Sequence, residues 1–419
     1  MAVAITRREQ ANAEALTRLC EAEPVLVDVR PAGEVVPGME PNMVLTSGAP
    51  MPWERYTGGQ RTAVLGGAVY EGLATDMDDA DRRLHSGEIV VGACQDHDCI
   101  GSLAGIYTAS MPVFVVENAA HGNRAFCNFF EGPSPKRLNY GVYDDEVRAS
   151  LLVVQDVIAP VVAEAVRRSE HGVALRPIIR HALHMGDELH SRNSAATLLF
   201  AREMFPLLLD LAEQLPAEVR RTFAFLADSA YFFLRLSMAA SKVTADAIRG
   251  LDGATTVCAM TFSCREFAVR VSGLGDTWVT SALPEVEAKL FDGYTADDIE
   301  LMGGESLISE TVGLGGFAQA AAFTLQAYQG GSPESMVAMN RAMYDITLGE
   351  HPEYTIPYLG FRGVPIGIDV MKVVETGVTP VADIGVAGRG GGQIGAGVMR
   401  MPIECFESAA AAFEARETT

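Results

Sequence analysis

Apolar positions in the first third of the chain form short runs, which is typical of strands buried within a sheet. Three runs are rich in β-branched residues and are bounded by turn-forming residues: 24–29, 88–91 and 112–116. A helical pattern over 12–22 accompanies them. Alternation of strands with helices predicts an α/β domain, which we place at residues 1–145.

The middle of the chain has a different pattern, in which apolar residues recur at helical spacing. One such set is Val154, Val157, Ile158, Val161, Val162 and Ala165, and a second is Val219, Phe223, Leu226, Ala230 and Phe233. The second set predicts one long helix that Gly250 would close. We expect residues 146–250 to be mainly helical.

Strand patterns return in residues 251–419, together with many glycines. Residues 256–260 and 267–271 predict a hairpin, 380–386 predicts a strand that runs into a glycine loop, and a helix is expected after Pro402. We predict a third, glycine-rich α/β domain here. The whole chain is then a multidomain α/β (α+β) protein with a mainly helical middle region.

Charge and composition exclude several classes of protein. The 419 residues contain 54 Asp and Glu against 32 Lys and Arg, a net charge of −22, which argues against nucleic-acid binding. The most hydrophobic stretch, 223–240, carries Asp228 and Arg235, so no membrane span is expected. Seven cysteines without a CxxC pair and a polar start to the chain favour a cytoplasmic location.

The first candidate site is residues 181–193, which hold several histidines and acids. If the segment is helical, His181, His184 and Glu188 share one face. We expect His184, Glu188 and Asp187 to serve in acid–base catalysis, with Arg192 and Asn193 binding substrate. A solvated polar face and a metal site remain alternatives.

The second candidate is the glycine-rich segment 388–397, which follows a predicted strand. Glycines allow backbone N–H groups to approach an anion, and the expected binding residues are Arg389, Gly391, Gly392, Gln393 and Gly395. Tight structural turns are the alternative. The segment lacks the lysine of a P-loop, and no βαβ unit follows its formal GxGxxG match, so we expect no nucleotide cofactor.

Two further segments contain candidate binding residues. Glu310 precedes three glycines and a predicted small-residue helix, which suits either an anion or close helix packing. Arg124 and Glu131 belong to a region that also contains Lys136 and Arg137, so cations are concentrated there in an acidic protein. Surface charge on a connecting loop is the alternative interpretation of this region.

Several long motifs, in order along nearly the whole chain, resemble one family. They are 68–74, 109–118, 182–193, 310–318, 367–370 and 392–397. The chain is identified as resembling the YlbE-like family of bacterial proteins, which includes the AllG subunit of oxamate carbamoyltransferase. The resemblance implies a three-part α/β and helical architecture. It also implies transfer of a carbamoyl group between phosphate and an amide or amine nitrogen, in company with other subunits.

The working hypothesis is therefore a carbamoyltransferase without metal or cofactor. Residues 388–397 with Arg389 would bind phosphate, His184 with Glu188 would deprotonate the acceptor, and Arg192 with Asn193 would bind the acceptor. The expected partners are carbamoyl phosphate, an amide or amine acceptor, and other copies of the chain or other subunits. A non-catalytic subunit and a metal-dependent amide hydrolase using His181, His184 and Asp187 are the alternatives.

Overall fold

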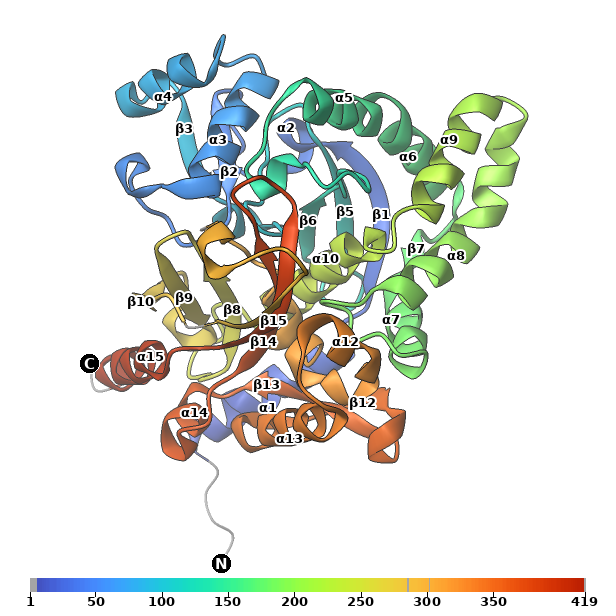
Figure 1. Cartoon of the computed structure of the whole chain (residues 1–419). Coiled ribbons are helices and arrows are strands. Elements are labelled where there is room, and N and C mark those ends of the chain that lie inside the picture. The colour runs from blue at the N-terminus through green and yellow to red at the C-terminus, as the bar shows by residue number, and fades with distance from the viewer. Residues whose placement is uncertain (1–5, 285, 301, 418–419) are drawn as a thin grey trace, which may run out of the picture.

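A computed structural model describes residues 6–284, 286–300 and 302–417 (Figure 1). Helices and several separate sheets alternate along the chain, so the predicted multidomain α/β class is confirmed. Most strand pairs are antiparallel; the parallel pairs are β2 with β3 and β4 with β6. The predicted domain boundaries stay a prediction.

The largest sheet has the strand order β4-β6-β5-β1-β7. Its strands are β1 (Pro24–Pro31), β4 (Cys99–Ile100), β5 (Pro112–Asn118), β6 (Arg124–Asn128) and β7 (Val173–Ala174). Successive side chains of a strand point to opposite faces, and β5 shows the result. Phe114 and Val116 face the main core, whereas Val113 and Val115 face a smaller core on the other side.

A parallel pair, β2 (Met43–Thr46) and β3 (Val90–Ala93), is joined by the crossover helices α3 (Gly58–Tyr70) and α4 (Met77–Ser86). The short helix α2 (Ala32–Val35) follows β1. The first helix, α1 (Arg7–Glu21), packs against the hairpin of β12 (Thr347–Ile356) and β13 (Arg362–Ile368). The beginning and the last third of the chain therefore lie side by side at the lower end of Figure 1.

The middle of the chain is helical, as predicted. Its helices are α5 (Asp145–Val153), α6 (Ala159–Arg168), α7 (Leu175–His184), α8 (Ser194–Ala212), α9 (Pro216–Ala227) and α10 (Phe232–Asp246). The prediction of one long helix through 219–233 is wrong, because α9 and α10 are separate and meet at 81°. The break is useful to the fold, since it lets α10 cross β1, β4, β5 and β6.

Residues 145–168, which comprise α5, a π-helical turn and α6, are long and apolar enough to cross a membrane on length and composition alone. Half of the apolar 18-residue window within that stretch is buried inside the protein. α6 packs on β1, α8 and α9, which is the environment of a core helix.

The last third contains two three-stranded antiparallel sheets. One has β8 (Val257–Phe262), β9 (Glu266–Val271) and β10 (Val279–Ala282), and the other has β11 (Val286–Leu290), β14 (Val381–Ala387) and β15 (Gln393–Arg400). The predicted hairpin is β8–β9, and the predicted terminal helix is α15 (Ile403–Glu417). The remaining helices are α11 (Ile308–Thr311), α12 (Gln326–Gln329), α13 (Pro333–Met343) and α14 (Val370–Thr376).

Of the two glycine-rich segments, one differs from its predicted form, and the other forms the tight turn that was the alternative prediction. The segment after Glu310 is not a helix of small residues but a series of short 3₁₀ turns at 315–317, 319–321 and 323–325. The segment 388–392 is the turn of the β14–β15 hairpin. Neither segment presents a long helix N-terminus.

Candidate active site

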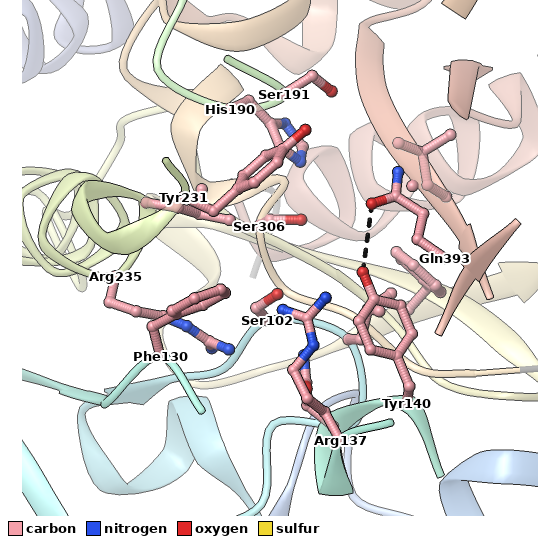
Figure 2. Close-up of a pocket in the computed structure, with 16 residues that line it drawn as sticks. Ser102, Phe130, Arg137, Tyr140, His190, Ser191, Tyr231, Arg235, Ser306 and Gln393 are labelled. Carbon is pink, nitrogen blue, oxygen red and sulfur yellow. Dashed lines mark hydrogen bonds between the residues drawn. The ribbon is translucent and has the colours of Figure 1, made fainter. Parts of the chain in front are cut away.

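A cavity of about 70 Å³ lies where segments from all three zones of the chain converge (Figure 2). Polar or aromatic groups line most of it. They are Ser102, Phe130, Arg137, Asn139, Tyr140, His190, Ser191, Tyr231, Arg235, Phe262, Ser306 and Gln393. The volume suits a small molecule and is too small for a dinucleotide.

Two arginines form one side of the cavity. Figure 2 shows the guanidinium groups of Arg137 and Arg235 turned toward its centre, near Ser102. Among the described residues, neither has a carboxylate oxygen within 4.0 Å, and the Nε atom of each is buried without a hydrogen-bond partner. Arg235 is only 2% exposed. Because neither arginine forms an ion pair with a carboxylate of the described residues, this wall of the cavity is suited to receive an anion.

The surrounding residues hold both arginines in place. Arg235 Nη1 donates to Asn128 Oδ1 at 2.9 Å, and the Arg137 guanidinium lies 4.6 Å from the centre of the Tyr140 ring. Behind them, the buried Glu131 carboxylate accepts backbone N–H groups of Leu138 and Asn139. Burial raises the pKa of Glu131, while the charges of the two arginines oppose the shift.

A histidine faces the arginines from the opposite side (Figure 2). His190 Nδ1 lies 2.8 Å from Glu310 Oε1, and both side chains are buried. Burial by itself lowers the pKa of His190, but the charge and hydrogen bond of Glu310 outweigh burial and the net pKa is raised. Within the described chain no hydrogen bond occupies Nε2. The imidazole is therefore poised as a proton donor toward the cavity.

The loop between α7 and α8 places His190 through an unusual backbone. Leu189 has φ +74° although it is not glycine, a conformation that persists only where the surroundings enforce it. The Glu188 carboxylate accepts the N–H groups of His190, Ser191 and Arg192, which folds the loop around it. Asp187 Oδ2 accepts the N–H of Ala196 at 2.8 Å and so caps α8.

The turn after Glu310 encloses the same pair. Gly316 N donates to Glu310 Oε1 at 2.9 Å, and Gly315 N donates to the Glu188 carbonyl at 2.7 Å. Gly315 has φ +58°, and a Cβ atom there would collide with the Glu310 carboxylate and lie 2.9 Å from His190 Cβ. Only glycine fits this close approach.

A second buried acid pair lies behind the histidine. Burial, followed by the Asp383 charge, raises the pKa of Glu188 well above its usual value. Burial also raises the pKa of Asp383, to about 6, while a hydrogen bond with Glu188 lowers it. The raised pKa favours the protonated form of Glu188, and Asp383 Oδ1 accepts hydrogen bonds from Gln319 Nε2 at 2.5 Å and Gln329 Nε2 at 3.1 Å.

The β14–β15 hairpin closes one edge of the cavity. Tyr140 Oη donates to Gln393 Oε1 at 3.3 Å across that edge (Figure 2). At the turn, Gly391 and Gly392 have φ +87° and +75°, and they lie against Val142 and Pro135.

Comparison with known proteins shows which family the chain belongs to. A family model described as oxamate carbamoyltransferase subunit AllG matches residues 89–306. The oxamate carbamoyltransferase subunit AllG of Escherichia coli K12 is 37% identical over 96% of each chain. The chain belongs to the AllG family.

Two further proteins are similar to this chain, one in sequence and one in sequence and structure. The uncharacterized protein YahG of Escherichia coli K12 is 40% identical over 95% of this chain and 84% of its own length. The crystal structure of a conserved protein of unknown function from Enterococcus faecalis V583 has a TM-score of 0.94 and 38% identity, covering 98% of both chains.

The AllG fold brings some of the predicted site residues together. Gln393 lines the cavity, Glu310 and Glu188 surround His190, and Glu131 lies behind the arginines. Asp187 lies one layer further out, where Arg192 Nε is 3.2 Å from its Oδ1. Asn193 is buried and donates to the His190 carbonyl at 2.9 Å.

Other predicted residues lie away from the cavity. His184 is exposed at the end of α7, with Nε2 2.8 Å from Thr355 Oγ1. The expectation that His184 and Glu188 share a helix face is wrong, because α7 ends at His184. Arg124 pairs with Glu117 on the surface, Arg389 is exposed in the hairpin turn, and Gly395 pairs with Leu290 inside the sheet.

The residues of the alternative metal site do not converge. Among the described residues, no group of three or more His, Cys, Asp or Glu side chains is arranged to hold a metal ion. His181 and His184 are exposed on α7, whereas Asp187 is buried beneath α8.

Sequence reasoning did not assign roles to four important groups: His190, Arg235, Ser102 and Ser306. His190 belonged to the histidine-rich candidate segment, and its neighbours received the roles instead. Arg235 carried one usable signal, since it is a cation within the most apolar stretch of the chain. A charge in such a stretch must find a buried partner or a ligand.

Proposed function

We propose that this AllG-family chain is a carbamoyltransferase, acting as a subunit of a larger enzyme. It would move a carbamoyl group between carbamoyl phosphate and a small amide or amine acceptor such as oxamate. One observation carries the proposal: two arginines that form no ion pair with a carboxylate in the described part of the chain face a buried His–Glu pair across one small cavity. The family membership supports the reaction type, since AllG is named as a subunit of oxamate carbamoyltransferase.

The reaction needs few covalent steps from the protein. In the synthetic direction the acceptor nitrogen attacks the carbamoyl carbon, and the bond from that carbon to the phosphate oxygen breaks. Phosphate leaves with the electron pair, and the nitrogen loses one proton. In the opposite direction phosphate attacks the carbamoyl group and the acceptor is released. Catalysis then depends on positioning and on stabilising negative oxygen atoms.

The two sides of the cavity suit the two ends of this reaction. We assign the phosphate oxygens to Arg137 and Arg235, whose planar guanidinium groups match an oxyanion in a bidentate manner. In Figure 2, Ser102 lies beside the guanidinium groups of the two arginines and Ser306 lies between Arg137 and His190, so both hydroxyl groups are assigned to donate to the carbamoyl oxygen. Charge develops at this oxygen as the carbon becomes tetrahedral.

His190 is assigned the proton transfer. Glu310 raises the pKa of the imidazole and so favours its protonated form. We assign Nε2 to donate a proton to the departing group, and the neutral imidazole to accept one in the reverse direction. Glu188 and Asp187 are then positioning residues, because their carboxylates hold the loop that carries His190 and the start of α8. Gln393, at the cavity edge, is assigned to the acceptor.

We also propose that the chain works with partner subunits in the cytoplasm. The relative named AllG is a subunit, so a shared or completed active site is expected from the assembly. No metal, nucleotide or other cofactor enters the proposed reaction.

The test is phosphate release from carbamoyl phosphate, measured with a panel of amide, urea and amino-acid acceptors. The chain is assayed alone and with the products of the adjacent genes. Acceptor-dependent release in either setting supports the proposal. Release that depends on partners but survives loss of both Arg137 and His190 would place the chemistry in another subunit and make this chain a non-catalytic member. Absence of release in every setting would contradict a transferase role.

A further inference from the structure

A second cavity, of about 170 Å³, lies directly against the polar one. The two share four wall residues: Leu103, Phe262, Ile384 and Gly385. The second cavity is otherwise mainly apolar, with Val286, Met302 and Met399 among its lining residues. A polar anion-binding space and an apolar space are therefore separated by one layer of side chains.

Phe262 is the bulkiest part of that layer and is rigidly held. It ends β8, is 7% exposed, and exchanges two backbone hydrogen bonds with Gly304, at 3.0 Å and 2.8 Å. A Cβ atom at Gly304 would lie 2.7 Å from Cζ of the Phe262 ring, so the tip of the ring packs closely against the glycine. The ring has no free space on that side.

Leu103 completes the layer with a strained backbone. Its φ of +46° is unfavourable for a leucine, and the residue is only 9% exposed. Strain at a buried wall residue persists because the surrounding structure fixes it. The small volume of the polar cavity is thus imposed by the wall and does not reflect a lack of space behind it.

We propose that Phe262 is a specificity-determining partition, which restricts the site to small acceptors by closing off the apolar cavity. That the excluded ligand is an acceptor rests on the proposed function. The arrangement of the two cavities and of Phe262 does not depend on it. In the absence of phosphate, Arg137 and Arg235 can bind a simple carboxylate, which then probes the size of the same cavity. With the ring removed, that carboxylate gains room to extend an apolar substituent toward Met399. Contact between a ligand's apolar group and such a lining favours binding roughly in proportion to the area buried.

The test uses two simple carboxylates that differ by an apolar group, acetate and phenylacetate. Their affinities are measured by NMR titration of the purified chain. We expect the ratio of phenylacetate to acetate affinity to rise at least tenfold in Phe262→Ala over the wild type. Phe413→Ala removes a ring from the same hydrophobic core, lines neither cavity, and should leave the ratio unchanged. An unchanged ratio in Phe262→Ala would overturn the partition.

A second variant fills the space behind the wall. Adding Met399→Phe to Phe262→Ala should return the ratio toward that of the wild type, because Met399 lines only the apolar cavity. If the alanine variant does not fold, Phe262→Leu provides the same comparison with a smaller expected rise. Carboxylate binding requires no carbamoyl transfer, so a negative transfer assay leaves this test intact. Failure of acetate to bind at all would contradict the anion site itself.

Discussion

His190 Nδ1 and Glu310 Oε1 are 2.8 Å apart, although 120 residues separate them in the chain. Both are buried, and the backbone on each side is specialised to bring them together: Leu189 is left-handed and Gly315 leaves room for the carboxylate. The pair faces two arginines across a cavity. This arrangement gives the chain a proton donor and an anion site in one place.

Replacing Glu310 by Gln tests the first half of this arrangement. The imidazole loses the carboxylate that holds its proton, so the pKa of His190 falls. We expect kcat for carbamoyl transfer to drop about 100-fold. Because the acid form is active below the pKa, the high-pH decline in rate should also move to lower pH. Glu266→Gln, which removes an acid paired with Arg55 away from the cavity, should change neither quantity. An unaltered pH profile in Glu310→Gln would be inconsistent with the assigned role.

Arg137 tests the anion site. Arg137→Met keeps an apolar stem against Phe130 and Tyr140 but removes the charge, so KM for carbamoyl phosphate should rise at least about tenfold. Arg137→Lys should lie between this variant and the wild type, since it keeps the charge without the bidentate geometry. Arg124→Met is the matched control, because Arg124 is exposed and pairs with Glu117. Equal KM values for Arg137→Met and Arg124→Met would contradict the assignment.

Glu305 predicts how stability depends on pH. Burial raises the pKa of this carboxyl to about 8 against the ordinary 4.5, so the folded state holds its proton more tightly than the unfolded state. Stability is therefore lost as pH rises from about 4.5 and reaches its full loss above about 8. Glu305→Gln removes this contribution. Between pH 5 and pH 9, the free energy of unfolding of this variant should fall by about 1–3 kcal/mol less than that of the wild type.

Denaturant unfolding at several pH values measures this difference. Glu407→Gln, on the exposed face of α15, should behave as the wild type does. Parallel pH dependences in the wild type and Glu305→Gln would show that the carboxyl is not protonated in the folded protein.

The hairpin turn offers a matched pair of glycines. Gly391 has φ +87°, and a Cβ atom there would lie 2.6 Å from the Val142 side chain, whereas a Cβ atom at Gly390 meets nothing within 4 Å. Gly391→Ala should displace the hairpin from its contact with Val142 and weaken the Tyr140–Gln393 hydrogen bond. The KM for the acceptor should then rise severalfold. Gly390→Ala should leave KM unchanged. Equal effects of the two variants would mean that the hairpin does not shape the cavity.

Local patterns predicted much of the fold but not how its parts meet. Strands such as 24–29 and 112–116, the β8–β9 hairpin and the terminal helix follow from periodicity and turn residues. The break between α9 and α10 did not, because the apolar spacing continues through residues 228–231 and the bend is imposed by packing across the sheet.

The candidate site was predicted in pieces. The segments that contain His190, Glu310, Gln393 and Arg137 were each singled out from the sequence, yet no local signal indicates that they surround one cavity. Roles were assigned by helical spacing to His184 and Glu188, and that spacing fails because the helix ends at His184. Long-range contacts decide which histidine is buried beside an acid.

The most direct test of the account is the rate of acceptor-dependent phosphate release by His190→Gln, with all partner subunits present. Glutamine preserves much of the packing but cannot carry the proton. The account predicts a fall in kcat of at least about 100-fold, with the complex still assembled and carbamoyl phosphate still bound. A rate equal to that of the wild type would contradict the placement of the reaction in this cavity.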